Sequence, residues 1–276
     1  MGTRHLFCFF IVLLLSSCTS STSQGPLRID GSNGVRPLME AVAASYMGYY
    51  DERKVEVGEG MPSAERLAAL DEGRIDLVMA SHGLDEEALR AEGYDVYRFA
   101  QMPVVLAINT ENNRMEAITT AELCGIYAGA YRNWSELRGT DLPIRPFARP
   151  RAEVDMEVLE ANLPCFRNLT MAGEVQTRER SGELAQALMD TPGAIGMTTM
   201  TRVLASKGKL RALALDGIRP DYMNMSNGNY YLMRDAFLVA RPNASQKVKD
   251  FLDFVEGAGM EVVMKERAMP LNRKGF

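Results

Sequence analysis

Near its amino-terminal end, the sequence passes three times from a strand-like apolar run, through a short polar turn, into a helical pattern. The turns are residues 30–38, 58–63 and 81–83, and each of them contains a serine. Repeated strand–turn–helix units build a parallel sheet with helices on its faces. The turns then lie at the carboxyl ends of the strands, the edge at which open α/β sheets bind ligands. The sequence therefore predicts an α/β fold with its site at that edge.

The first turn reads Asp-Gly-Ser-Asn-Gly-Val-Arg-Pro-Leu and has the composition of an anion-binding loop. Gly31 and Gly34 permit positive φ and a close backbone approach, whereas Ser32 and Asn33 provide side-chain hydrogen bonds. Backbone N–H groups at the start of the following helix, with the helix dipole behind them, favour a bound anion. A turn that only connects a strand to a helix is the alternative that the motif leaves open.

The first residues have the features of an export signal. Arg4 precedes the apolar run of residues 6–15, which is too short to span a bilayer and is followed at once by Leu-Ser-Ser-Cys18. This ending resembles the lipobox of bacterial lipoproteins. We expect a signal peptide over residues 1–17, a lipid on Cys18, and a tether over residues 18–26. An ordinary secretion signal with an incidental cysteine is the alternative.

Composition excludes several classes of function. The 276 residues are 46% apolar and carry 31 basic and 36 acidic side chains, so the chain is large enough for two lobes and lacks the basic surface of a nucleic-acid partner. Once the signal is removed, His82 is the one remaining histidine, and the sequence contains no Gly-x-Ser-x-Gly motif and no metal-ligand spacing. We therefore expect no enzyme activity, no cofactor and no metal site.

Cys124 and Cys165 are the cysteines that an exported chain retains besides Cys18. An oxidising compartment would allow these two residues to form a disulfide. Cys124 lies in an apolar helical pattern, however, which equally suits a buried free thiol. The sequence is compatible with both alternatives.

Taken in order, four segments resemble the phosphate-binding type of periplasmic solute-binding protein, the partner of an ABC importer. One of them is the first polar turn, and another contains the only tryptophan of the chain. The resemblance extends over nearly the whole mature sequence. The four segments are residues 31–38, 73–81, 126–134 and 191–197.

The resemblance implies the type II periplasmic-binding-protein fold. In this fold two α/β lobes, each a mixed and mostly parallel sheet flanked by helices, are joined by two hinge strands and close on a ligand. Lobe 1 would comprise residues 27–108 together with residues 216–276. Lobe 2 would comprise residues 109–215.

The resemblance also implies a set of ligand-binding positions. In the family, the first loop supplies a hydroxyl and backbone N–H groups, and an arginine pairs with the ligand oxygens. His82 stands where phosphate-specific members carry an aspartate that accepts the proton of hydrogen phosphate and repels sulfate, so this discrimination would be weakened. A solvent-facing His82 is the alternative. The predicted ligand-binding residues are Ser32, Asn33, Gly34, Ser63, Ser81, His82, Arg149 and Arg151.

The loop that follows Arg149 departs from the family pattern. Where the family has hydroxyl donors, this chain has Glu153 and Asp155, which add negative charge. Arg151 would offset that charge or form a structural salt bridge. Ser181 would supply a replacement hydroxyl or cap a helix. These exchanges remove contacts through which the family binds phosphate.

We therefore expect an exported, lipid-anchored solute-binding protein that captures an oxyanion, foremost phosphate, by hinge closure and delivers it to an ABC permease. We expect a monomer that contacts the membrane only through the lipid anchor. The alternative is a divergent relative without a transport role, which acts as a sensor or scaffold or binds another small ligand. The missing donors favour this alternative, whereas the retained serines and Arg149 favour transport.

Overall fold

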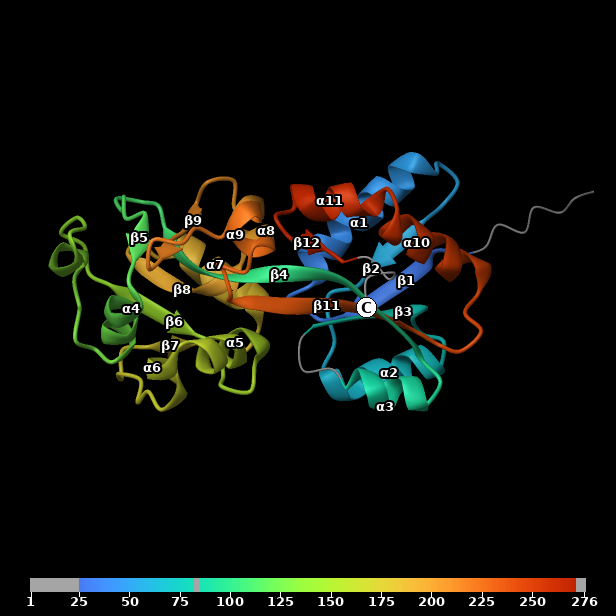
Figure 1. Cartoon of the computed structure of the whole chain (residues 1–276), viewed down its shortest axis with the longest axis horizontal. Helices are drawn as coiled ribbons and strands as arrows, with labels where there is room; N and C mark the ends of the chain where they lie inside the picture. Colours follow the sequence, from blue (N-terminus) through green and yellow to red (C-terminus); the bar gives the residue numbers. More distant parts are fainter. Residues whose placement is uncertain (1–24, 82–84, 272–276) are drawn as a thin grey trace, which may run out of the picture.

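The computed structural model describes residues 25–81 and 85–271 and shows two lobes built on one continuous ten-stranded sheet (Figure 1). The outer strands of each lobe pair in parallel, whereas the strands that connect the lobes run antiparallel to their neighbours. Helices cover both faces of the sheet. The predicted α/β fold is therefore confirmed.

Lobe 1 contains the strands β1 (Leu27–Gly31), β2 (Val55–Val57), β3 (Leu77–Ser81) and β12 (Met269–Pro270), and the helices α1 (Arg36–Tyr49), α2 (Ser63–Asp71), α3 (Glu86–Ala91), α10 (Gln246–Glu256) and α11 (Gly259–Lys265). Helices α1, α10 and α11 lie on one face of its strands, and α2 and α3 lie on the other (Figure 1). Successive side chains of β3 alternate between the faces: Met79 packs on the α1 side and Val78 on the α2 side.

Lobe 2 contains the strands β5 (Ala117–Ile118), β6 (Arg145–Ala148), β7 (Gln176–Thr177), β8 (Ala194–Thr199), β9 (Leu210–Ala212) and β10 (Ala214–Leu215). Its helices are α4 (Thr120–Tyr127), the 3-10 helix η1 (Trp134–Leu137), α5 (Val154–Asn162), α6 (Pro164–Arg167), α7 (Ser181–Asp190), α8 (Met200–Ala205) and α9 (Tyr222–Ser226). The buried Trp134 of η1 donates its ring N–H to the carbonyl of Gly193 at 3.0 Å, which fixes the turn before β8.

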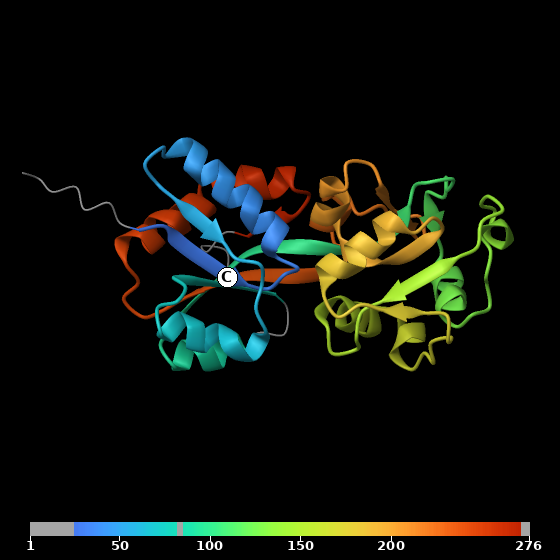
Figure 2. The same cartoon turned by 180° about the vertical axis from the view of Figure 1, so that it is seen from behind.

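Two strands connect the lobes, β4 (Asp95–Asn109) and β11 (Met233–Ala240), and both views show them running between the lobes (Figure 1, Figure 2). The strand order is β2-β1-β3-β11-β4-β8-β6-β7, with β9 and β12 also paired to β4. β4 pairs with β11 as far as Pro103 and with β8 from Val104 onward. A proline has no N–H for a ladder bond, which suits the residue at which the partner strand changes.

The core of lobe 2 extends further along the chain than the sequence indicated. Tyr230 and Leu232 belong to the same buried cluster as β8, and the Tyr230 hydroxyl donates to the carbonyl of Val104 at 2.7 Å. The packing therefore assigns residues 216–232 to lobe 2 rather than to lobe 1. The expected boundary at Leu215 was misplaced because these residues pack back on the second half of β4 before the chain returns along β11.

Cys124 in α4 and Cys165 in α6 form a disulfide, with their Cα atoms 6.3 Å apart. The bond joins two helices of lobe 2 across 41 residues of sequence. Of the two alternatives that the sequence allowed, the structure has the disulfide.

Candidate functional site

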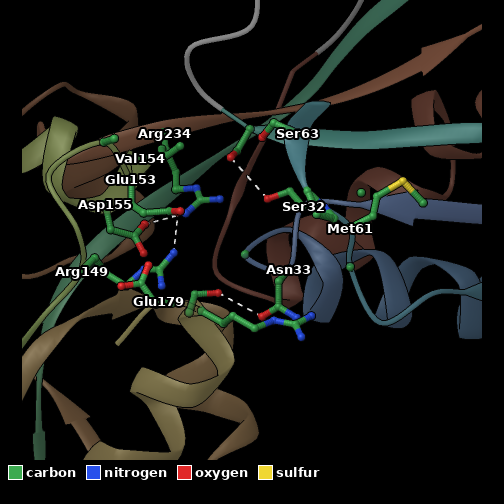
Figure 3. A pocket seen from close by; sticks show the side chains of 18 of the residues that line it. Ser32, Asn33, Met61, Ser63, Arg149, Glu153, Val154, Asp155, Glu179 and Arg234 are labelled. Carbon is green, nitrogen blue, oxygen red and sulfur yellow. Dashed lines mark hydrogen bonds and ion pairs between the residues drawn. The ribbon is translucent and has the colours of Figure 1, made fainter. Parts of the chain in front are cut away.

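A cavity of about 550 Å³ lies between the two lobes. Lobe 1 contributes the turns after β1 and β2 and the last residue of β3, and lobe 2 contributes the loop after β6 and the start of α7. Figure 3 shows the side chains of the two walls facing one another across this space. Six predicted ligand-binding residues line the cavity: Ser32, Asn33, Gly34, Ser63, Ser81 and Arg149.

The wall from lobe 1 provides serine hydroxyls. Ser32 and Ser81 are buried at the ends of neighbouring strands, and their Oγ atoms lie 3.4 Å apart. The strands approach closely because Gly31 has a φ of 143° and a Cβ there would collide with the carbonyl of Met79. Ser63 is exposed and is the first residue of α2, with Pro62 as the N-cap.

The wall from lobe 2 provides Arg149, directly after β6. Its side chain is only 5% exposed; it donates to the carbonyl of Arg178 at 2.8 Å and pairs with the Glu153 carboxylate at 2.5 Å. The Nε atom of Arg149 is buried and has no hydrogen-bond partner within the described residues. A buried guanidinium with an unused N–H is suited to an anionic ligand.

Arg151 does not line the cavity. Its guanidinium pairs with Glu160 and also donates to the carbonyl of Leu169 at 2.5 Å. The structure therefore removes Arg151 from the predicted ligand set. It forms a structural salt bridge, as the sequence allowed, but with a partner further along α5 than Glu153 or Asp155.

Arg234 lines the cavity although the sequence analysis did not identify it. It lies at the beginning of β11, and its Nη1 pairs with Asp155 Oδ1 at 2.5 Å, with both side chains 3% exposed. A Cβ on Gly34 would lie 2.5 Å from Arg234 Nη2, so the glycine leaves room for the guanidinium. The sequence signal was a charged pair, Arg234-Asp235, within an otherwise apolar strand.

Arg66 of α2 is a second cation that the sequence analysis missed. It lines the same cavity, and its Nε and Nη2 both donate to the carbonyl of Met61 at 3.2 Å. Burial lowers the pKa of Arg66, and the nearby Glu153 carboxylate opposes that shift. An arginine on a helix of lobe 1 faces the loops of lobe 2 only after the chain folds, so periodicity gave no sign of it.

Asn33 joins the two lobes. Its Oδ1 accepts hydrogen bonds from the Ser181 hydroxyl (3.2 Å), the backbone N–H of Gly182 (3.1 Å) and Arg202 Nη2 (2.8 Å). Arg202 Nη2 also donates to the Asn33 carbonyl at 2.7 Å, and burial lowers the pKa of Arg202 to about 10. Ser181, a possible replacement donor in the sequence analysis, is therefore engaged with Asn33.

Two predicted residues, Cys18 and His82, lie outside the described residues, as does the predicted signal peptide. No helix in residues 25–81 or 85–271 combines the length and the hydropathy needed to cross a bilayer. The same residues contain no cluster of three histidine, cysteine or acidic side chains arranged for a metal ion.

The fold and the site together define a class: two α/β lobes joined by two strands, with a polar, arginine-containing cleft between them. A family model described as a PBP superfamily domain matches residues 16–257. The chain belongs to this superfamily. The resemblance to phosphate-binding solute-binding proteins is confirmed by individual relatives.

The phosphate-binding protein PstS of Bacillus subtilis (strain 168) is 26% identical over 245 residues, which cover 87% of this chain and 78% of that protein. Protein SphX of Synechococcus elongatus is 26% identical over 259 residues, covering 87% and 76%. A solved structure of a putative phosphate ABC transporter substrate-binding protein from Clostridium perfringens, with bound phosphate, has a TM-score of 0.72 at 24% identity and covers 90% of this chain and all of that one. The names of the Bacillus subtilis and Clostridium perfringens proteins describe binding proteins, which agrees with the expectation that the chain is not an enzyme.

Proposed function

We propose that this chain is an extracytoplasmic solute-binding protein that captures phosphate in the cleft and delivers it to an ABC importer. The observation that carries the proposal is the pair of buried arginines, Arg149 and Arg234. Each keeps an Nε–H that has no partner among the described residues. Ser32 and Ser63 lie on the opposite wall (Figure 3).

Capture would proceed by closure of the lobes about β4 and β11. Serine hydroxyls from lobe 1 and Arg149 from lobe 2 would then hold the anion from both sides, with Arg234 between them. Neutral donors and charged guanidinium groups in a water-poor cleft bind an oxyanion more strongly than the same groups do in water. Opening of the lobes at the permease would release the anion.

The proposed anchor is Cys18. A lipid on this residue, followed by a tether, would hold the binding protein close to a membrane permease. Mass spectrometry of the mature protein from its own cell envelope tests the anchor. A chain that begins at Cys18 and carries acyl groups supports it, and a water-soluble mature chain without acyl groups contradicts it.

The ligand is tested by calorimetric titration of the mature protein with phosphate, sulfate and molybdate. Binding of phosphate in preference to the other two anions supports the proposal. The Arg151→Ala variant is the matched control, because Arg151 lies near Arg149 in sequence but outside the cavity. Wild-type and control proteins that bind none of the three anions would contradict a phosphate-binding role.

A relative without a transport role is the second candidate function. The observation in its favour is that Glu153 and Asp155 already pair with the two buried arginines of the cleft. A sensor or scaffold of this kind would leave phosphate uptake unchanged when its gene is deleted. Reduced uptake at low external phosphate would favour the transport role.

A further inference from the structure

Both buried arginines of the cleft already hold a carboxylate of the same chain. Arg149 Nη2 donates to Glu153 Oε2, and Arg234 Nη1 donates to Asp155 Oδ1, each at 2.5 Å. Figure 3 shows both acidic side chains beside the arginines at the lobe 2 wall. Each pair therefore places a carboxylate oxygen against the guanidinium that an oxyanion would need.

The two carboxylates enter the cleft from the beginning of α5. Glu153 is the N-cap residue and Asp155 is the second residue of the helix, where the helix dipole favours a negative charge. In the family that the sequence resembles, hydroxyl residues follow the arginine of this loop. A hydroxyl donates a hydrogen bond to a bound anion, whereas a carboxylate repels the anion and competes for the same guanidinium.

Among the described residues that line the cleft, there is no surplus of positive charge. Four arginines and four acidic residues are among the residues that line it. A dianion that enters the cleft therefore meets charges that are already balanced. Because a buried charge without a partner is strongly unfavourable, each carboxylate stabilises the guanidinium that it contacts, and an anion that binds there competes with it.

We propose that Glu153 and Asp155 determine the specificity of the cleft as internal competitors of the ligand. In the free protein they occupy Arg149 and Arg234, and an oxyanion binds by displacing them. A tethered partner acts at an effective concentration of about a millimolar or more, so free phosphate at lower concentration competes poorly. This inference rests on the proposed phosphate-binding function. It makes the affinity of the cleft for phosphate depend on the two carboxylates.

The test is a titration of inorganic phosphate into the mature wild-type protein and the variants Glu153→Gln and Asp155→Asn. Both substitutions keep the size of the side chain and remove its charge. We expect the dissociation constant for phosphate to fall about tenfold or more in each variant, because the competing charge is lost. Tighter phosphate binding by both variants than by a wild type that itself binds phosphate would support the proposal.

The matched control is Glu160→Gln. Glu160 lies on the same helix and also pairs with an arginine, Arg151, but neither residue lines the cavity. The substitution changes the net charge by the same amount. We expect its phosphate affinity to stay within about twofold of the wild type, because distant charges are screened by salt.

A second measurement covers the risk that Asp155→Asn folds poorly. This variant leaves Arg234 buried without its counter-charge, so its thermal unfolding temperature should fall in phosphate-free buffer. Added phosphate should raise that temperature more than it does for the wild type. Glu153 is 43% exposed, so Glu153→Gln tests the proposal without a comparable folding defect.

Unchanged or weaker phosphate binding in both variants, with a wild type that binds phosphate, would overturn the proposal and leave the phosphate-binding function standing. Weaker binding together with a lost preference for phosphate over sulfate would also overturn it. That result would indicate that the carboxylates accept a hydrogen bond from the protonated oxygen of hydrogen phosphate. Absence of phosphate binding in the wild type and in every variant would overturn this inference and the proposed function together.

Discussion

At the scale of single residues, the site divides into side chains that the local sequence predicts and side chains that only the folded chain brings in. Ser32 follows β1, Ser81 is the last residue of β3 and Arg149 follows β6, so strand-to-helix patterns place each of them at the carboxyl end of a strand. Arg234 comes from a strand that returns to lobe 1 after all of lobe 2. Its contact with Asp155 joins residues 79 positions apart, and no local pattern contains that information.

Arg149 is the residue at which the phosphate proposal is tested most directly. Arg149→Ala removes a buried guanidinium and leaves Glu153 without its partner, so the cleft becomes more negative. We expect the dissociation constant for phosphate to rise about a hundredfold or more, since a charged hydrogen bond to a ligand contributes about 1.5–3 kcal/mol and the added repulsion increases that effect. Calorimetric titration measures it.

Arg151→Ala is the control for that measurement, because it removes an arginine two residues away that pairs outside the cavity. Its phosphate affinity should remain close to that of the wild type. An Arg149→Ala protein with wild-type affinity would show that the anion binds elsewhere.

At the scale of elements, the sequence predicted the strand–turn–helix units well and the junction between the lobes less well. The units depend on local periodicity and on glycine turns, as at Gly31, and these are visible in a single sequence. The boundary of lobe 2 depends instead on the packing of residues 216–232 against β4. The short helix α9 lies within these residues, and its local sequence pattern does not indicate the lobe to which it belongs.

Asp76, just before β3, links three elements of lobe 1. Its Oδ2 accepts hydrogen bonds from the backbone N–H of Arg28 and from Lys247 Nζ of α10, each at 2.9 Å. We expect Asp76→Asn to lower the free energy of unfolding by about 1–3 kcal/mol, because two partly buried donors lose a charged acceptor. Urea unfolding at pH 7 measures this difference. Asp250→Asn, which breaks a more exposed pair between Arg53 and α10, should change stability by less than about 1 kcal/mol.

The Asp76 contribution should depend on pH. Burial opposes ionisation of this carboxyl, but the hydrogen bonds from Lys247 and the Arg28 N–H outweigh it, and the pKa of Asp76 lies below its ordinary value of 3.8. A lowered pKa stabilises the folded state above the ordinary value, and this stabilisation is lost as the pH falls through the folded-state pKa. The stability difference between wild type and Asp76→Asn should therefore be full at neutral pH and shrink below about pH 4. A difference that grows on acidification would contradict this assignment.

The disulfide between α4 and α6 is a further stabilising link within lobe 2. It closes a loop across 41 residues, for which chain entropy predicts a contribution of about 4 kcal/mol, with measured effects of about 2–4 kcal/mol. The double variant Cys124→Ser/Cys165→Ser should lose stability of this size in urea unfolding. Reductant should destabilise the wild type and leave the double variant unchanged. Equal stability of wild type and variant would show that the bond contributes nothing.

At the scale of the whole molecule, the lobes are held together by hydrogen bonds that involve no ligand. Asn33 of lobe 1 binds Ser181, Gly182 and Arg202 of lobe 2, and Arg180 Nη2 donates to the carbonyl of Glu59 at 3.2 Å. The fold class and the two connecting strands were predictable from the resemblance. The closed arrangement was not, because it depends on which side chains meet after two lobes of separate sequence come together.

Asn33→Ala tests whether this contact sets the balance between open and closed lobes. The substitution removes the acceptor for three donors, one of them the buried guanidinium of Arg202. Neutral hydrogen bonds contribute about 0.5–1.5 kcal/mol and charged ones about 1.5–3 kcal/mol, so the closed form should lose about 2.5–6 kcal/mol relative to the open form. Small-angle X-ray scattering of the ligand-free variant should then give a larger radius of gyration than the wild type.

Asn162→Ala is the control, because that side chain bonds only to Val158 within α5 among the described residues. An unchanged radius of gyration in Asn33→Ala would mean that packing around β4 and β11 keeps the lobes closed. The hydrogen bonds of Asn33 would then be a result of closure and not its cause.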